Sequence, residues 1–258
     1  MIRYAEGDES RWGLVEDDEV FAADGDLAGG LRIAGRVGRL PEMSLLAPVA
    51  PRNVVAIGRN YADHARELGN ALPTTPMVFL KSVSSVVGPG ADIISPAATD
   101  MLQHEAEIAV VIGRTARRVS RREAPSVVLG YTLANDVTAR DLQRTDVGIT
   151  LAKGFDTFCP IGPWIDTDVD LDTLTVQAEV DGELRQDGKV ADMVFPIPVL
   201  IEFVTQFLTL EPGDVILTGT PSGVGSLLPG NTVTVRSPAL GQLTNRVVAE
   251  QPDLAGVG

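Results

Sequence analysis

Cysteine, histidine and long apolar runs are scarce in this sequence of 258 residues. Because Cys159 is the only cysteine, no intrachain disulfide is possible, and its neighbours Pro160 and Ile161 favour a buried, inert thiol over a nucleophile. No stretch approaches the about 20 apolar residues of a membrane span, and the first residues lack the apolar core of a secretory signal. We therefore expect a cytoplasmic protein.

Positive charge is also in short supply. The chain has 35 Asp and Glu against 21 Lys and Arg, which gives a formal net charge of -14. Nucleic-acid backbones and anionic membranes would repel such a protein, so neither is an expected partner. A G-x-G-x-x-G motif between strand and helix and a Gly-Lys-Ser/Thr ending are both missing, so no nucleotide motif is present.

Lysine is the rarest of the charged residue types and occurs only at positions 81, 153 and 189. Lys81 ends the apolar run 77–80, and Lys153 also lies between apolar residues. A partly buried ammonium costs free energy unless it meets an anion, which here could be a carboxylate, an enolate or an oxyanion. The alternative is that each amine reaches solvent or a neighbouring acid along its flexible stem.

Two acids, Glu105 and Glu107, stand one residue apart at the start of an apolar run. Every position from 108 to 112 is apolar, which is typical of a strand buried on both faces. Positions i and i+2 of a strand share a face, so both acids point the same way. With Asp136 they form an oxygen-only set that suits Mg2+, Mn2+ or Ca2+ rather than zinc, which prefers His and Cys. The alternative is a solvated strand end that carries ordinary acidic residues.

The chain divides near a proline-containing connector. Residues 1–50 hold short strand-like pieces with acidic turns, which predict a small β-rich N-terminal domain. Residues 51–250 form the expected main domain, and 251–258 form a C-terminal tail. Many short strands and few helices predict a β-rich α+β fold, a mixed β-sandwich or roll, rather than a doubly wound parallel sheet. The strands expected after the connector are 54–58, around 110, 128–134, 175–180, 215–218, 232–235 and 243–248, with one amphipathic helix at 197–208.

A short helix is expected within residues 60–69, because a cap residue precedes it and a glycine ends it. His64 and Glu67 are three residues apart and so share a face of this helix. A carboxylate beside an imidazole orients the ring and raises its basicity, as a general base for water requires. The alternative is a surface contact between His64 and Glu67 without functional consequence.

Two further segments carry groups suited to anions. Arg140 and Gln143 follow a strand that ends near residue 134, and they would lie on one side of a helical turn, suited to grip a carboxylate. The strand at 215–218 feeds a Gly-rich turn whose backbone amides and Thr220 hydroxyl could bind an anionic oxygen. The alternative for this second segment is a purely structural turn.

The order of these segments resembles the fumarylacetoacetate hydrolase family over roughly residues 50–250. The motifs that carry the resemblance are Gly58-Arg-Asn-Tyr-Ala-Asp-His64, Phe79-Leu-Lys81, His104-Glu-Ala-Glu107, Ala134-Asn-Asp136-Val-Thr-Ala-Arg140-Asp, Lys153-Gly-Phe-Asp156 and Pro212-Gly-Asp-Val-Ile-Leu-Thr-Gly-Thr220-Pro. The resemblance implies a mixed β-sandwich roll, commonly homodimeric, behind a small N-terminal domain.

The resemblance also implies roles for single residues. The ligands it implies for a divalent ion, usually Mg2+ or Mn2+, are Glu105, Glu107 and Asp136. It places Lys153 near the ion, and it places His64 and Glu67 in a lid that orders over bound substrate. The residues it assigns to the substrate site are Lys81, Arg140, Gln143 and Thr220.

The family includes several chemistries, which share the enolate of a 2-oxo acid stabilised by a divalent ion. We expect first a hydrolase that cleaves a C-C bond in a small acylpyruvate-type diketo acid, with His64 and Glu67 activating water and Lys153 assisting by charge or proton transfer. Alternatives on the same scaffold are an oxaloacetate decarboxylase and a 2-hydroxyhepta-2,4-diene-1,7-dioate isomerase. A metal-stabilised binding protein is the alternative outside enzyme chemistry.

Overall fold

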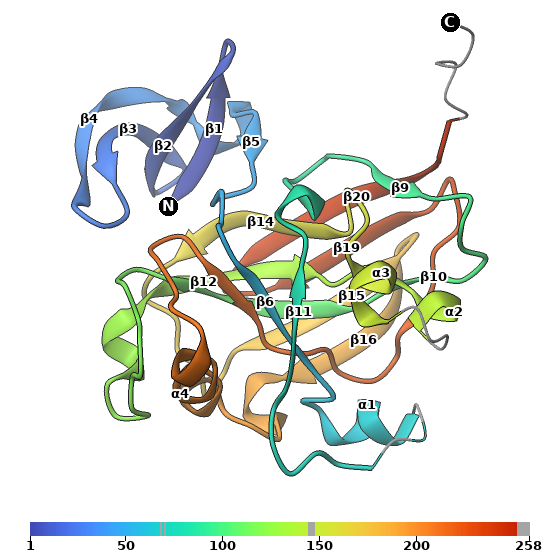
Figure 1. The fold of residues 1–258 in the computed structure, drawn as a ribbon. Helices are drawn as coiled ribbons and strands as arrows, with labels where there is room; N and C mark the ends of the chain where they lie inside the picture. Colours follow the sequence, from blue (N-terminus) through green and yellow to red (C-terminus); the bar gives the residue numbers. More distant parts are fainter. Residues whose placement is uncertain (68, 70, 144–147, 252–258) are drawn as a thin grey trace, which may run out of the picture.

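A small antiparallel sheet precedes a larger β-rich body (Figure 1). The computed structural model describes residues 1–67, 69, 71–143 and 148–251. The predicted C-terminal tail therefore lies outside the described residues, apart from Gln251. None of the helices in these described ranges is long and apolar enough to cross a membrane.

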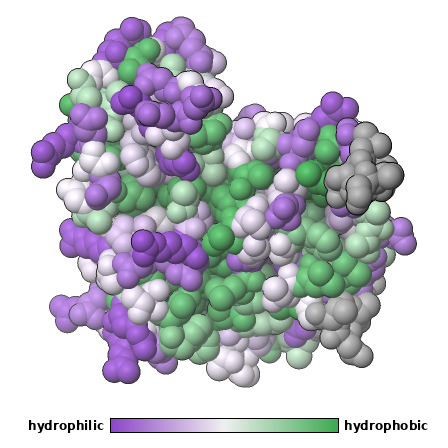
Figure 2. Space-filling model, turned by 45° about the horizontal axis from the view of Figure 1, so that its top comes forward, coloured by the Kyte–Doolittle hydropathy of each residue, from purple (hydrophilic) through white to green (hydrophobic). Residues whose placement is uncertain are grey.

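The N-terminal sheet has the strand order β4-β3-β2-β1-β5. Its strands are β1 (Ile2–Glu6), β2 (Glu9–Glu16), β3 (Glu19–Asp26), β4 (Gly30–Arg39) and β5 (Leu45–Leu46). A connecting segment without regular secondary structure then leads to the next strand, which begins at Val54. Ile2, Tyr4 and Val20 form its small core. The Met1 ammonium donates a hydrogen bond of 2.7 Å to the Ile165 carbonyl and so ties this sheet to the main body. The outer surface of the sheet is mostly hydrophilic (Figure 2).

The main body contains two facing sheets and a small third one. The first has the order β7-β6-β17-β11-β12-β14-β8, the second β16-β15-β19-β20-β9, and the third β13-β10-β18. The strands are β6 (Val54–Gly58), β7 (Met77–Lys81), β8 (Val86–Val87), β9 (Ile93–Ser95), β10 (Leu102–His104), β11 (Ala106–Ile112), β12 (Val128–Asn135), β13 (Thr138–Ala139), β14 (Cys159–Asp166), β15 (Thr175–Val180), β16 (Glu183–Lys189), β17 (Val215–Leu217), β18 (Gly225–Ser226), β19 (Thr232–Ser237) and β20 (Gly241–Ala249). The prediction of a β-rich sandwich or roll is confirmed.

The central strand β11 is buried on both faces, as its unbroken apolar run predicts. One face contributes Ile108 and Val110 to the core between the two large sheets. The other face contributes Ala109 and Val111 to a second core, against which Trp12 of the N-terminal sheet packs. Burial of the whole strand places its N-terminal end, and the acids there, in a setting with little access to water.

Helices are few and short. They are α1 (Ala62–Glu67), α2 (Arg140–Gln143), α3 (Ile149–Lys153) and α4 (Ile197–Phe207), with single 3-10 turns at Leu40–Glu42, Val83–Ser85, Ala124–Val127 and Val190–Asp192. Helix α4 is the predicted amphipathic helix, and Leu200, Ile201 and Val204 on its inner face join the core between the large sheets. Of the shorter helices, α2 and α3 lie side by side and α1 lies below them, and all three are away from the N-terminal sheet (Figure 1).

Strand β14 is absent from the sequence-based expectations. It contains Pro160 and Pro163, and proline normally argues against a strand inside a sheet because it cannot donate to the ladder. Here the pairing of β14 with β12 is irregular, with a register shift between Tyr131 and Leu133. Cys159 at its start is fully buried, and burial raises the pKa of its thiol to about 12, in agreement with an inert side chain.

Candidate metal centre and active site

Three carboxylates meet at the N-terminal end of β11. Glu107 belongs to this strand, Glu105 directly precedes it, and Asp136 directly follows β12. The antiparallel register pairs Ala106 with Asn135, and the Asp136 amide donates to the Glu105 carbonyl at 2.9 Å. As a result, one carboxylate oxygen from each acid lies within 4.8 Å of the other two. The expected convergence of these three acids is confirmed.

Three cationic side chains surround these acids. The Lys81 ammonium lies 2.6 Å from Asp136, and the Lys153 ammonium lies 2.5 Å from Asp136 and 2.9 Å from Glu105. Arg140 forms an ion pair with the other oxygen of Glu105. Both ammonium groups are therefore buried rather than in solvent, and the anions that they meet are carboxylates of the chain itself. Lys153 also lies over the Phe79 ring, 5.2 Å from its centroid.

The cluster is buried and its formal charges balance. In their ionised forms Glu105, Glu107 and Asp136 carry three negative charges, and each side chain is buried, with at most 5 % of the residue exposed. The cationic half of the cluster consists of three equally buried side chains, Lys81, Lys153 and Arg140, which carry three positive charges. A buried charge is tolerated only when it is paired, so this balance explains why six ionisable groups can share one site.

Glu107 differs from the other two acids in its contacts with the surrounding cations. Among the residues that the structure describes, only the Gly219 amide donates a hydrogen bond to the Glu107 side chain, at 2.6 Å, and no cation lies within ion-pair distance of it. Burial raises the pKa of Glu107 well above its ordinary value, and the negative charges of Asp136 and Glu105 raise it further. Burial also acts on Glu105, but Lys153 and Arg140 outweigh it and hold the pKa of Glu105 below its ordinary value.

These residues fit a hard divalent cation. All three acids offer oxygen, which Mg2+, Mn2+ and Ca2+ prefer, and neither His nor Cys belongs to the set. The ionised form of Glu107 lacks a cationic partner, and a divalent ion among the three acids would supply it. The chain therefore has an acidic triad able to hold a metal.

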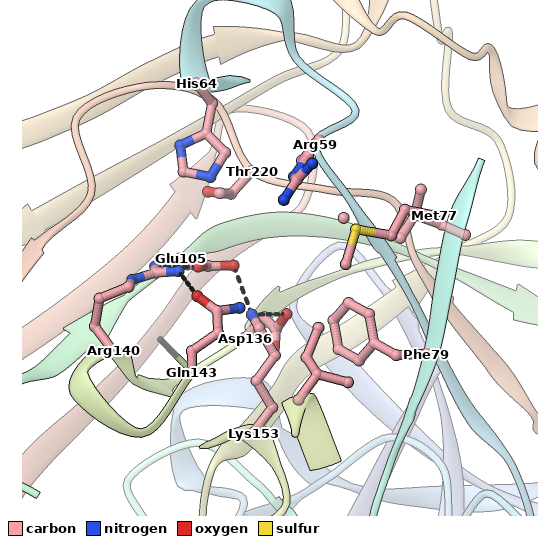
Figure 3. Close-up of a pocket in the computed structure, with 13 residues that line it drawn as sticks. Arg59, His64, Met77, Phe79, Glu105, Asp136, Arg140, Gln143, Lys153 and Thr220 are labelled. Atoms are coloured by element: carbon pink, nitrogen blue, oxygen red, sulfur yellow. Dashed lines mark hydrogen bonds and ion pairs between the residues drawn. The ribbon is translucent and has the colours of Figure 1, made fainter. Parts of the chain in front are cut away.

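A cavity of about 310 Å³ opens beside the acids (Figure 3). The residues that line it are Ile57, Gly58, Arg59, His64, Met77, Phe79, Glu105, Asp136, Arg140, Gln143, Ile149, Lys153 and Thr220. Glu105, Asp136 and Lys153 place the charged cluster in its wall, while Met77 and Phe79 give an apolar side. A small anion in this cavity would face the neighbouring cations and any divalent ion that the acids hold.

His64 and Glu67 form the predicted pair on helix α1. The Nδ1 atom of His64 lies 3.1 Å from a carboxylate oxygen of Glu67, and the other oxygen accepts from the Gly223 amide at 3.0 Å. The His64 side chain is buried, with 4 % of the residue exposed, whereas Glu67 is exposed, and a functional role for the pair stays a prediction. Glu67 fixes one ring nitrogen, and the ring lines the cavity above Thr220 (Figure 3).

Arg140, Gln143 and Thr220 also line the cavity, as their predicted role in substrate binding requires. The side-chain oxygen of Gln143 accepts a hydrogen bond of 2.5 Å from Arg140, which fixes the two side chains together. Thr220 donates its hydroxyl proton to the Ala106 carbonyl at 2.9 Å. Its hydroxyl is therefore left as an acceptor, so only its backbone amide could serve an anionic oxygen.

Lys81 is placed differently from the other predicted substrate residues. Its ammonium is fully buried against Asp136 and the Val137 carbonyl, and it is not among the residues that line the cavity. Its contact is with Asp136, one of the three acids of the candidate metal centre. Direct substrate binding by Lys81 stays a prediction.

Gln186 on β16 escaped the sequence reasoning. Its side-chain oxygen accepts from the Ala106 amide and from His104 Nδ1, both at 2.9 Å. Its amide group donates to the Thr220 hydroxyl and to the Pro221 carbonyl, both at 2.7 Å. Gln186 thus connects the N-terminal end of β11 to the Gly-rich turn that contains Thr220. The sequence does not indicate this long-range contact, because most neighbours of Gln186 in the hairpin are polar residues typical of an exposed strand.

Arg59 is a second residue that sequence reasoning left unassigned. It lies in the segment Gly58-Arg-Asn-Tyr-Ala-Asp-His64, in which the sequence predicts a catalytic role for His64 alone. In the structure its side chain points into the cavity (Figure 3). Its place directly after a buried strand end was the available signal, since such positions often face a binding site.

Two family models together match nearly all of the chain. The model described as Fumarylacetoacetate (FAA) hydrolase C-terminal matches residues 53–248. A second, described as Rv2993c-like, N-terminal, matches residues 1–48.

Characterised relatives point to enzymes that act on small acids. The chain is 42% identical to oxaloacetate tautomerase YisK of Bacillus subtilis, over 81% of this chain and 74% of that protein. It is 44% identical to the mitochondrial oxaloacetate decarboxylase of Dictyostelium discoideum, over 70% of this chain and 87% of that protein. A crystal structure of 5-carboxymethyl-2-hydroxymuconate delta-isomerase from Mycobacterium smegmatis superposes with a TM-score of 0.89 at 39% identity, covering 96% of this chain and 99% of that one. Family and relatives indicate an enzyme, and the chain belongs to the fumarylacetoacetate hydrolase family.

Proposed function

We propose that this protein is a divalent-metal-dependent enzyme that forms the enolate of a small 2-oxo acid, with oxaloacetate as the first candidate substrate. The single observation that carries the proposal is the acidic triad, two of whose members, Glu105 and Asp136, line a cavity that also presents Arg140 and Lys153. Two relatives above 40% identity, named for tautomerisation and decarboxylation of oxaloacetate, support the choice of substrate. Mg2+ or Mn2+ is the proposed ion, because both suit oxygen ligands.

The charge balance of the site supports an anionic substrate. When all three acids are ionised around a divalent ion, the six buried groups cancel one another, and the ion leaves two positive charges to be offset. When bound, the ion would supply the positive charge that stabilises an enolate oxygen. Arg140, held by Gln143, is the group best placed to orient a substrate carboxylate at the cavity wall.

Lys153 contributes charge rather than basicity. Burial lowers the pKa of its ammonium, but Asp136 and Glu105 outweigh burial and hold the pKa above its ordinary value. Lys153 is therefore protonated at neutral pH and stabilises negative charge that develops in the cavity. A protonated amine can also return a proton to the carbon of an enolate.

Hydrolysis of an acylpyruvate-type diketo acid is the second candidate, and the His64–Glu67 pair favours it. Hydrolysis needs a base that removes a proton from water, whereas decarboxylation of oxaloacetate needs no water. His64, oriented by Glu67 at the cavity wall, is the only histidine of the chain placed there. Isomerisation of a 2-hydroxy-dienoate, the activity named for the Mycobacterium smegmatis structure, also remains a prediction.

Replacing His64 with alanine is expected to separate these candidates. If His64 activates water, the variant loses acylpyruvate cleavage by about 100-fold or more, while decarboxylation of oxaloacetate changes by less than about tenfold. Steady-state kinetics on acetylpyruvate and oxaloacetate measure both rates. Asp63→Ala, on the exposed side of the same helix, is the matched control. An equal loss of both activities in His64→Ala would rule out a water-specific role.

One experiment tests the proposed function as a whole. The products formed from acetylpyruvate, oxaloacetate and a 2-hydroxy-dienoate are identified side by side with Mg2+ and with Mn2+. Turnover of oxaloacetate as the preferred substrate is the expected result. Tight metal binding and a raised melting temperature without turnover of any of the three would instead indicate a metal-stabilised binding protein.

A homodimer and a cytoplasmic location stay predictions. The exposed apolar side chains of Leu80 and Leu151 line one shallow hollow, beside the elements that carry Lys81 and Lys153. An apolar surface of this kind supports association with a second copy.

A further inference from the structure

Arg59 is a cation in the cavity without a partner in the described part of the chain. Lys81, Lys153 and Arg140 each form ion pairs with the acidic triad. Arg59 lines the same cavity, yet its guanidinium makes no hydrogen bond or ion pair with any residue that the structure describes. A guanidinium carries five donors in a planar fork that matches a carboxylate. Arg59 is therefore a positive group that an incoming ligand can engage.

The backbone around Arg59 is fixed by its neighbour. The Asn60 amide group donates to the carbonyls of Phe195 (3.1 Å) and Thr218 (2.8 Å), and its oxygen accepts from the Phe195 amide at 2.8 Å. Gly219 packs so closely that a Cβ there would lie 2.7 Å from the Asn60 Cβ. Between these contacts Arg59 has a φ of 58°, in the left-handed region that non-glycine residues seldom occupy. The chain thus holds Arg59 in an unfavourable backbone conformation, which is common where a side chain has a functional role.

Arg59 approaches the cavity from a different side than Arg140. In Figure 3, Arg140 and Gln143 lie beside Glu105, whereas Arg59 projects from the opposite wall, between Thr220 and Met77. A ligand whose first carboxylate lies near Arg140 would therefore extend its far end towards Arg59. Met77 and Phe79 on the adjoining wall would instead suit a ligand whose far end is apolar. Whether the far end of the ligand is charged or apolar therefore determines whether it contacts Arg59 or these two side chains.

Charge decides between these two walls. With an ion held by the three ionised acids, the six buried groups cancel one another, so the divalent ion and Arg59 together contribute three unmatched positive charges at the cavity. A monocarboxylate offsets one of these charges and a dicarboxylate offsets two. We propose that Arg59 binds the distal carboxylate of a dicarboxylic 2-oxo acid and makes this site selective for dicarboxylates over monocarboxylic acylpyruvates. This inference rests on the proposed function and names the substrate class of the same site.

Binding of two matched 2-hydroxy acids tests the assignment without requiring turnover. Malate has the four-carbon skeleton with a distal carboxylate, and lactate lacks that carboxylate. Dissociation constants are measured by calorimetry on the Mn2+-saturated full chain, for the unaltered protein, Arg59→Gln and Arg59→Lys. We expect the unaltered protein to bind malate about 10–100-fold more tightly than lactate, as a charge-assisted pair provides. In Arg59→Gln this preference falls below about threefold, and Arg59→Lys lies between.

Arg66→Gln is the matched control, because Arg66 is on neighbouring α1 and pairs with Asp63 at the exposed surface. It should leave both dissociation constants unchanged. The proposal is overturned if the unaltered protein does not prefer malate, if Arg59→Gln keeps the preference, or if Arg59→Gln weakens lactate binding as much as malate binding. A malate preference that depends on Arg59 in a protein that turns over no 2-oxo acid would support this assignment and overturn the proposed function.

Discussion

Replacing Glu107 with glutamine is expected to abolish metal-dependent turnover and, at the same time, to stabilise the metal-free protein. Glutamine has nearly the same shape, and its side-chain oxygen can still accept the hydrogen bond from Gly219. It cannot supply a negative charge to a divalent ion, so metal affinity and turnover should fall by about 100-fold or more. The stabilisation arises because the ionised Glu107 of the metal-free protein faces Asp136 and Glu105 without a cation of its own.

The stabilisation by Glu107→Gln should depend on pH. The pKa of Glu107 is raised in the folded protein above its ordinary value of 4.5, so the folded state opposes ionisation. Below about pH 4.5 the carboxyl is protonated both folded and unfolded, and the variant has no advantage. As the pH rises from there through the raised folded pKa, the unaltered protein loses stability that the glutamine variant keeps.

Thermal unfolding in the presence of a chelator measures this difference. At neutral pH the melting temperature of Glu107→Gln should exceed that of the unaltered protein by about 2–4 °C for each kcal/mol of relieved repulsion. With Mn2+ the order should reverse, because only the unaltered protein gains stability from binding the ion. Glu16→Gln, an exposed position in the N-terminal sheet, is the control. A lower melting temperature for metal-free Glu107→Gln at neutral pH would contradict this account.

Replacing Lys153 with methionine should have the opposite effect on stability. The Lys153 ammonium contacts both Glu105 and Asp136, and its loss leaves two buried carboxylates with less compensation. Removing one partner of a buried ion pair costs about 3–5 kcal/mol, equivalent to a fall of about 10 °C in the melting temperature. Turnover should fall by about 100-fold or more, since the cavity loses a charge that stabilises the enolate.

Added metal should recover part of the stability of Lys153→Met, because a divalent ion restores positive charge beside the same carboxylates. The measurement is thermal unfolding of the variant with chelator and with Mn2+. Lys189→Met is the matched control, since Lys189 is the chain's one exposed lysine and lies outside the cavity. If Lys153→Met and Lys189→Met unfold at the same temperature without metal, the buried pairs of Lys153 do not stabilise the fold.

The acidic triad was predictable from sequence because its geometry is largely local. Glu105 and Glu107 share a face by the two-residue period of a strand, and the antiparallel pairing of the next strand then brings Asp136 beside them. The pairing of His64 with Glu67 was predictable for the same reason, since three residues along a helix make neighbours. In both cases local periodicity determines which side chains meet.

Contacts that depend on the tertiary fold were not predictable. The sequence indicated that Lys81 needs an anion, but only the assembled sheets show that this anion is Asp136. Gln186 lies in a hairpin of mostly exposed residues, and its link to Thr220 spans 34 positions. Strand β14 was missed because its prolines disfavour a regular ladder, and the irregular pairing that accommodates them is a property of the whole sheet.

The dependence of turnover on the metal tests the central claim most directly. The protein is stripped with a chelator until metal analysis finds no divalent ion, and oxaloacetate turnover is then measured before and after Mg2+ or Mn2+ is added. The acidic triad predicts that turnover falls to about 1 % or less and returns when the ion saturates its site. Full activity of the metal-free protein would contradict the account.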